Sequence, residues 1–178
     1  METSIHETER LILRPFDDGD ATALHRILNQ EKILQYFPDP GSPTLERARR
    51  FVDHQIEQWR HVGYGWWAVE EKESGKLLGW NGLQYLPETE ETEIGFLIDK
   101  DYWGRGLTTE AGRFALRFGF EGLNLQEIVA LAHPENGGSQ RVIEKLGLRF
   151  VEEAIYFGMA VRRYALDAEG YRRDASRS

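Results

Sequence analysis

The chain has 178 residues, 40% hydrophobic and 12% aromatic, which predicts a folded domain with a real core and excludes a disordered chain. Its net charge of −8 disfavours nucleic acid as a partner, because binding to a phosphate backbone needs a basic surface. Cysteine is absent, which excludes disulfides and thiolate nucleophiles, and neither a signal peptide nor a membrane-spanning apolar run is recognisable, so we expect a cytoplasmic protein.

The N-terminal part predicts one strand and two helices. A strand is expected over residues 10–16, and apolar residues then recur at helical spacing from Ala21 to Leu28. Three prolines and a glycine make residues 36–44 a loop, and Thr44 is the expected N-cap of the second helix.

The middle of the chain changes to a strand pattern. Residues 64–71, 76–86 and 92–99 predict three strands separated by turn-like segments. Asn81-Gly82, inside the second strand, fits either a tight turn or a β-bulge, and the bulge is favoured. An amphipathic helix follows and ends near residues 119–122.

The last third predicts a buried strand over residues 127–133, a short helix closed by Gly147, and a hairpin of two strands over residues 148–154 and 155–167. The element order is β-α-α-β-β-β-α-β-α-β-β, which predicts a mixed α/β sheet of about seven strands with four helices on its faces. We expect one domain over residues 1–168 and a loose polar tail over residues 169–178.

Several familiar motifs are missing. Gly104 and Gly106 are followed by Thr109, so the third glycine of a dinucleotide fingerprint is absent, and neither a P-loop nor a G-x-S-x-G elbow occurs. His54 and His61 lie seven apart on one predicted helix without an obvious third ligand, so no metal site is predicted.

Two loops between a strand and a helix carry the chemistry. YWGRGLTTEAG (102–112) is either a plain turn or an anion cradle of inward-facing amides, to which Arg105 adds charge. In HPENGGSQRV, which begins at residue 133, Asn136 and Ser139 fit helix caps and ligand contacts alike, and Arg141 and Lys145 share a helix face.

Together, EIGFLIDKDYWGRGLTTEA and NGGSQRVIEKLGLRF resemble the GNAT superfamily of acyl-CoA N-acyltransferases, closest to the Rim-type N-terminal acetyltransferases of ribosomal proteins. The resemblance implies a mostly antiparallel sheet that splays between the strands at 92–99 and 127–133, with the thioester of acetyl-CoA in the gap. It implies that the backbone amides of residues 104–108 hold the pyrophosphate and that residues 96–98 pair with pantetheine like a neighbouring strand.

The family loop pattern, Gln/Arg-x-x-Gly-x-Gly/Ala, is changed at Trp103 and Thr108. Asn136 matches an asparagine that contacts the cofactor arm. The expected cofactor-binding residues are Phe96, Leu97, Ile98, Trp103, Gly104, Arg105, Gly106, Leu107, Thr108, Asn136, Ser139 and Arg141.

The position of the tyrosine acid that many family members use falls at Ile143, whereas the serine of the Rim-like branch matches Ser139. The resemblance therefore implies Ser139 as the acid, although it also fits a helix cap. Glu93 is the first candidate base because it shares a pleat face with Leu97. A solvated edge carboxylate is the competing interpretation, and Tyr85 and Tyr156 are alternative bases.

The predicted function is acetyl transfer from acetyl-CoA to a primary amine by direct attack on the thioester. A protein N-terminus is favoured because an α-amine has a pKa of about 8 and a lysine one of about 10.4. The alternatives are a small amine, such as a polyamine, amino acid or amino sugar, and a non-catalytic acyl-CoA sensor. The expected partner is the amine acceptor, without nucleic acid or membrane, and both monomer and homodimer are open.

Overall fold

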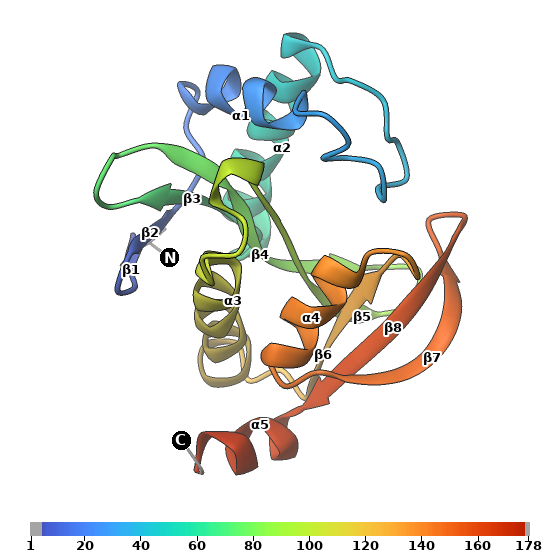
Figure 1. Ribbon diagram of the computed structural model, residues 1–178. Helices are drawn as coiled ribbons and strands as arrows, with labels where there is room; N and C mark the ends of the chain where they lie inside the picture. Colours follow the sequence, from blue (N-terminus) through green and yellow to red (C-terminus); the bar gives the residue numbers. More distant parts are fainter. Residues whose placement is uncertain (1–4, 177–178) are drawn as a thin grey trace.

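The computed structural model describes residues 5–176, which form one open sheet with helices on both faces (Figure 1). The strands are β1 (His6–Glu7), β2 (Leu11–Arg14), β3 (Trp66–Glu71), β4 (Leu77–Leu86), β5 (Glu91–Ile98), β6 (Glu127–Ala132), β7 (Arg149–Tyr156) and β8 (Met159–Asp167). The helices are α1 (Asp20–Leu28), α2 (Leu45–Val62), α3 (Leu107–Arg117), α4 (Gly137–Lys145) and α5 (Ala168–Ala175). A 3-10 turn (Lys100–Tyr102) precedes α3 and a π-helical turn (Phe118–Gly122) follows it.

The strand order in the sheet is β1-β2-β3-β4-β5-β6-β8-β7. All neighbours run antiparallel except β5 and β6, which are parallel. β4 and β5 share eight residue pairs, whereas β5 and β6 share one, Glu93 with Val129. The sheet therefore opens between β5 and β6, which confirms the expected splay.

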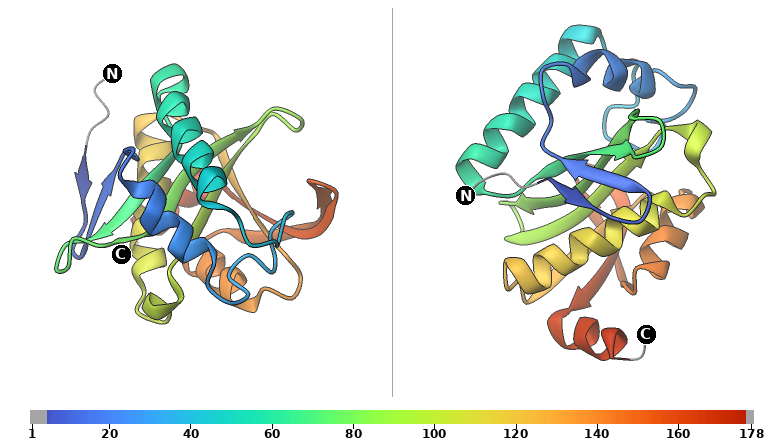
Figure 2. Two further views of the ribbon diagram at one scale, coloured as in Figure 1. Left: turned by 90° about the horizontal axis from the view of Figure 1, so that it is seen from above. Right: turned by 90° about the vertical axis from the view of Figure 1, so that its left-hand side faces the viewer.

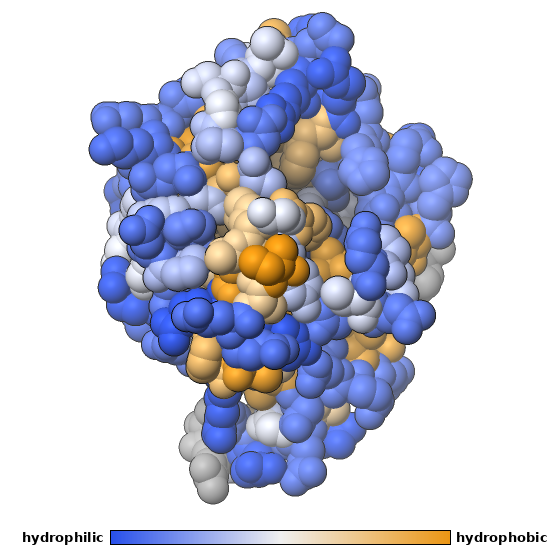
Figure 3. All heavy atoms as spheres, turned by 90° about the vertical axis from the view of Figure 1, so that its right-hand side faces the viewer, coloured by the Kyte–Doolittle hydropathy of each residue, from blue (hydrophilic) through white to orange (hydrophobic). Residues whose placement is uncertain are grey.

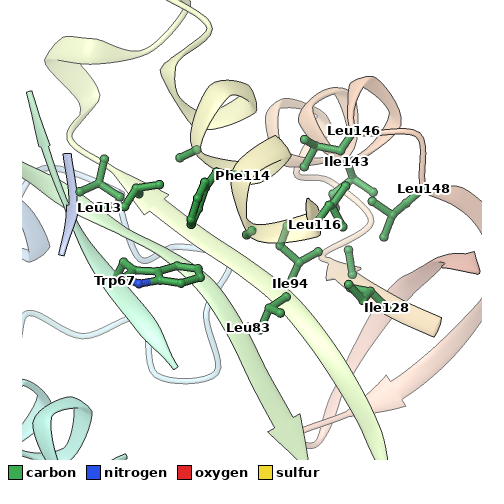
Figure 4. Close-up of a cluster of buried hydrophobic side chains, with 14 of the residues drawn as sticks. Leu13, Trp67, Leu83, Ile94, Phe114, Leu116, Ile128, Ile143, Leu146 and Leu148 are labelled. Atoms are coloured by element: carbon green, nitrogen blue, oxygen red, sulfur yellow. The ribbon is translucent and has the colours of Figure 1, made fainter. Parts of the chain in front are cut away.

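Helices cover both faces of the sheet (Figure 2). α3 and α4 lie on one face, where Phe114 and Leu116 of α3 pack against Trp67, Leu83 and Ile94 from three strands (Figure 4). α1 and α2 lie on the opposite face of the N-terminal half.

The adjacent residues Trp66 and Trp67 show how the two cores are divided. Successive side chains of a strand point to opposite faces. Trp67 accordingly packs in the core under α3, and Trp66 in the core under α1 and α2. The pair therefore supplies one large aromatic side chain to each layer.

Local signals that were read from the sequence are found at three helix ends. The Thr44 hydroxyl accepts a hydrogen bond from the Arg47 N–H at 3.2 Å and caps α2. α3 ends at Arg117 and continues as the π-turn to Gly122. Gly147 follows α4 with a φ of +93°, as expected of a C′ residue.

The prediction of a loose tail was wrong for residues 169–175, which belong to α5 (Ala168–Ala175), so there are five α-helices and not four in the described part of the chain. Asp167 caps this helix by accepting from the Gly170 N–H at 2.6 Å. Tyr171 stacks on Phe120 with ring centroids 4.7 Å apart. The helix thus depends on a tertiary contact that its polar sequence does not reveal, and residues 177–178 lie outside the described residues.

The strand predictions also need correction. The sheet has eight strands among the described residues, because the short β1 pairs with β2. The bulge in β4 lies opposite Val69 and Glu70, whereas Asn81-Gly82 pairs regularly with β3. The hairpin turn is Phe157-Gly158, whose φ values of +52° and +75° fit a type I′ turn, so β7 extends to Tyr156.

Candidate active site

The site begins where β5 ends, and Asp99 fixes that point. Its carboxylate accepts hydrogen bonds from Arg26 at 2.7 Å, from Gln30 at 2.8 Å and from the Asp101 N–H at 3.0 Å. Burial opposes ionisation of Asp99, but these three bonds outweigh it and hold its pKa below the usual range. The direction in which the chain enters the next loop is therefore set by contacts from α1 and the segment after it.

The glycine loop forms a cradle of free amides. Gly104 and Gly106 have φ values of +75° and +78°, which residues with a side chain rarely adopt. α3 starts at Leu107, and no backbone N–H from residue 104 to 109 is bonded to an acceptor in the described part of the chain. Free amides at a helix N-terminus attract an anion, so the loop fits the pyrophosphate of coenzyme A.

The side chains around the cradle differ in what they offer. Trp103 donates its indole N–H to the Ile98 carbonyl at 2.7 Å and so ties the loop back to β5. The Arg105 guanidinium donates to the Asp101 carbonyl at 3.0 Å and lies over the Tyr102 ring. Its charge is thus turned toward the preceding turn, and Arg105 offers the cradle its backbone only.

A cleft of about 930 Å³ lies at the opening of the sheet. Its walls come from the α1–α2 loop, β5, the N-termini of α3 and α4, and the β7–β8 hairpin (Figure 1). Apolar side chains gather around a hollow on the side to which this loop and hairpin point (Figure 3). Every expected site residue except Arg105 lines the cleft. No group of three or more potential metal ligands is found among the described residues.

The second loop places Ser139 at the cleft. Asn136 caps α4 by accepting from the Ser139 backbone N–H at 3.1 Å, which leaves the Ser139 hydroxyl without a hydrogen bond in the described part of the chain. Gln140, which the sequence analysis missed, donates to the carbonyls of His133 and Pro134. Its position on the buried face of α4, where an apolar residue is usual, was the available signal.

The side-chain oxygen of Gln140 also ties the loop to the sheet. It accepts hydrogen bonds from Arg162 at 2.7 Å and from the Tyr164 hydroxyl at 3.3 Å. Both donors belong to β8, so one buried glutamine joins β8 to the start of α4. This bracing holds the first turn of α4 against the cleft.

Glu93 lies where β5 and β6 part, and its side chain reaches the cleft. Burial of its carboxyl, together with the nearby Glu91 carboxylate, raises the pKa of Glu93 to about 8. Glu91 itself is held as an anion by Arg163 and the Tyr156 hydroxyl. A carboxyl with a pKa near the working pH suits a general base.

The two tyrosines considered as alternative bases lie away from the cleft. Tyr156 donates its hydroxyl to Glu91 at 2.5 Å, and burial together with this bond raises the pKa of Tyr156. Tyr85 is 43% exposed on β4, and neither side chain lines the cleft.

An indole forms part of the cleft floor, a feature that the sequence analysis missed. Trp66 pairs with Gly82, which pairs with Gly95 on the next strand. A Cβ atom on Gly95 would lie 2.5 Å from the Trp66 ring, so the ring occupies the space that a side chain there would need. Glycine inside strands often marks such a close approach. Trp80 and Phe51 add aromatic surface beside it.

Comparisons with known proteins agree with this geometry. A model described as "Acetyltransferase (GNAT) domain" matches residues 10–149. The uncharacterized protein YkkB of Bacillus subtilis is 30% identical over 146 residues, which cover 80% of this chain and 84% of YkkB. Spermidine N(1)-acetyltransferase of Escherichia coli is 25% identical over 81% of this chain and 75% of its own.

Solved structures give the same picture. An acetyltransferase of the GNAT family from Bacillus anthracis superposes with a TM-score of 0.79 at 28% identity, covering 93% of this chain and 99% of its own. RimL, a ribosomal L7/L12 α-N-protein acetyltransferase solved with coenzyme A, superposes with a TM-score of 0.76 at 20% identity, covering 92% and 98% of the two chains. At that identity the likeness to RimL concerns the fold.

Proposed function

The chain belongs to the GNAT family of acetyltransferases, and on this basis we propose that it acetylates the α-amine of a protein or peptide N-terminus. It is an acetyl-CoA-dependent N-acetyltransferase, so the proposal concerns the acceptor. Relatives and structural neighbours differ in acceptor, since one is named for spermidine and another for a ribosomal protein.

The charge of the cleft carries the choice of acceptor. Three carboxyl side chains line it, those of Asp39, Glu93 and Glu135, among the described residues. Asp39 is paired with Arg47 at 2.5 Å, and the raised pKa of Glu93 keeps that carboxyl mostly neutral at pH 7. A polyamine carries several positive charges and needs several ionised partners, whereas an N-terminus presents a single amine. The cleft therefore favours a peptide.

The residues around the cleft fit acetyl-CoA, which supplies the activated acetyl group as a thioester. The free amides of residues 104–108 would hold the pyrophosphate. Residues 96–98 offer a strand edge to pantetheine, because β5 has no strand partner on that side beyond Glu93 in the described part of the chain. Asn136 and Arg141 border the same cleft and would contact the rest of the arm.

The side chains of Glu93 and Ser139 carry out the proton transfers that the reaction needs. The Glu93 carboxylate accepts a proton from the acceptor ammonium, and its pKa of about 8 matches that of an α-amine, about 8, better than that of a lysine, about 10.4. The neutral amine then attacks the thioester carbon. As the C–S bond breaks, the Ser139 hydroxyl donates a proton to the departing sulfur and takes up the second proton of the attacking nitrogen. A backbone N–H of Leu97 or Ile98 stabilises negative charge on the reacting carbonyl oxygen.

A panel of acceptors tests the proposal. Thiol release from acetyl-CoA is measured with peptides that have a free N-terminus, with the same peptides blocked at the N-terminus but containing lysine, and with spermidine. We expect turnover with the free N-terminus, and faster turnover of spermidine would instead assign a small amine as the acceptor. Binding of acetyl-CoA without turnover of any amine would favour the sensor.

A further inference from the structure

Arg10 joins the N-terminal hairpin to the glycine loop, although about a hundred residues separate them in the sequence. Its Nη1 donates to the Arg105 carbonyl at 2.8 Å, and its Nε donates to the Glu110 carboxylate at 2.7 Å. One guanidinium therefore holds both the residue before the N-cap of α3 and a residue in the first turn of that helix. Arg10 does not line the cleft and lies behind the loop.

The bond to the Arg105 carbonyl fixes the direction of an amide. In a trans peptide the carbonyl and the following N–H point in opposite directions. Because Arg10 holds the Arg105 carbonyl on the hairpin side, the Gly106 N–H points away from the hairpin. Gly106 itself borders the cleft, so the N–H is available to an anion there.

The same peptide is prone to rotate without that bond. It turns about the ψ angle of Arg105 and the φ angle of Gly106, and Gly106 has no side chain to restrict that φ angle. A rotated peptide would present the Arg105 carbonyl oxygen, a partial negative charge, to the phosphates. Holding the carbonyl back therefore preserves the polarity of the cradle.

Arg10 also offsets the negative charge of Glu110, which lies close to the proposed anion site. Its carboxylate lies in the first turn of the helix whose N-terminus is to hold an anion. It accepts hydrogen bonds from Thr8, from the Arg10 backbone and from the Arg10 side chain, which overcome the effect of burial and hold its pKa below the usual range. The carboxylate thereby anchors the hairpin, and the guanidinium neutralises its charge.

We propose that Arg10 is a positioning residue of the cofactor site: it orients the Arg105–Gly106 peptide so that the cradle binds the pyrophosphate of coenzyme A. The inference rests on the proposed placement of the pyrophosphate at residues 104–108. It adds a residue outside the cleft to the binding machinery.

Calorimetric titration of Arg10→Met tests the proposal with three probes. Coenzyme A and dephospho-coenzyme A both contain the pyrophosphate, and pantetheine lacks it. We expect the first two probes to bind about tenfold more weakly or worse, because the charge-assisted hydrogen bond from the Gly106 N–H to the phosphates is lost. Pantetheine should bind the variant as it binds the wild type. Equal loss for all three probes, or no loss for any, would overturn the role of Arg10.

Two further variants distinguish orientation of the Arg105–Gly106 peptide from neutralisation of the Glu110 charge and from a loss of protein stability. In Arg10→Met with Glu110→Gln the unpaired carboxylate is gone, so recovered coenzyme A affinity would mean that Arg10 only neutralises charge. Arg10→Lys keeps the charge but cannot bridge both acceptors, and we expect an intermediate affinity. If Arg10→Met folds poorly, the same titrations are carried out with Arg10→Lys.

Lys72→Met is the matched control, because Lys72 holds Glu7 and the Thr8 carbonyl of the same hairpin without touching the loop. We expect it to bind coenzyme A as the wild type does. A wild-type protein that binds coenzyme A no better than pantetheine would disprove the cradle itself, which distinguishes that failure from a failure of Arg10.

Discussion

Gly106 allows the sharpest test of a single residue. Replacement by valine puts a β-branched residue at a φ of +78°, which costs about 1–3 kcal/mol of backbone strain or forces the loop into another shape. The nearest atom to an added Cβ, Nη2 of Arg10, is 3.7 Å away, so strain rather than a clash is the cause. We expect Gly106→Val to weaken coenzyme A binding tenfold or more in a calorimetric titration.

Gly75 provides the control for this substitution. It has a φ of +64° with open space around it in the β3–β4 turn, far along the chain from the cradle. Gly75→Val imposes similar strain and is expected to lower stability without changing coenzyme A affinity. Equal effects of the two variants on affinity would count against the placement of the pyrophosphate.

Glu93 predicts a particular pH dependence. Only the carboxylate accepts a proton, and because its pKa is raised to about 8, the active fraction grows as pH rises through about 8. We expect kcat/KM for an α-amine peptide to rise with pH toward about 8 and Glu93→Gln to lower it. The acceptor amine has a pKa of about 8 and titrates in the same window, so the lower rate of the variant, and not loss of the pH limb, is the readout. Glu88→Gln, an exposed change in the β4–β5 turn, should keep the wild-type profile.

Replacement of Ser139 by alanine tests whether its hydroxyl acts in catalysis or the residue only belongs to the helix cap. Asn136 accepts from the backbone N–H of Ser139, which alanine retains, so Ser139→Ala leaves the cap of α4 intact. We expect an unchanged melting temperature with a lower kcat, measured by thiol release. A wild-type kcat would remove the hydroxyl from the mechanism.

At the scale of elements, the weakest joint of the sheet is the β5–β6 pair, and Arg163 of β8 reinforces it. The guanidinium contacts Glu91 at 2.5 Å and Glu127 at 3.0 Å, and its side chain is 13% exposed. We expect Arg163→Met to lower the free energy of unfolding by about 2 kcal/mol, because the partly buried Glu91 carboxylate loses its cation. Arg173→Met removes a pair with both partners exposed and should cost about 0.5 kcal/mol or less.

The pH dependence of that difference follows from Glu91. Burial raises its pKa, but the hydrogen bonds from Tyr156, Thr89 and Arg163 dominate and leave it below the usual range. A depressed folded pKa gives stability that is present above the unfolded pKa and is lost as pH falls through the folded one. The gap between wild type and Arg163→Met in chemical denaturation should therefore shrink in acid.

Elements with their own periodicity could be predicted from the sequence, and elements that depend on partners could not. The spacing of apolar residues predicts α2 and α3, and the capping chemistry of Thr44 predicts where α2 begins. The two residues of β1 form a strand only because β2 pairs with them. The same division holds at the site. The glycine loop was visible in the sequence, whereas the bond from Arg10 to that loop and the bonds that join Gln140 to β8 arise only in the fold.

At the scale of the whole molecule, the cleft lies between two halves of the sheet, which also share the core under α3 and the ion pairs of Arg163. β5 belongs to the N-terminal half and β6 to the C-terminal half, and a single residue pair connects them. The cofactor would lie against both, with the cradle on one side and the start of α4 on the other. Bound coenzyme A should therefore act as a tie between the halves.

Hydrogen exchange with mass spectrometry tests where that tie forms. Coenzyme A should slow exchange of the cradle amides at residues 104–108 and of the free-edge amides of β5, because both sets gain acceptors. Pantetheine should slow β5 alone, since it has no pyrophosphate to occupy the cradle. α5 lies apart from the cleft and serves as the internal control, with equal exchange in all three states. Protection of β5 by coenzyme A without protection of the cradle would place the pyrophosphate elsewhere and would remove the basis for Arg10 as a positioning residue.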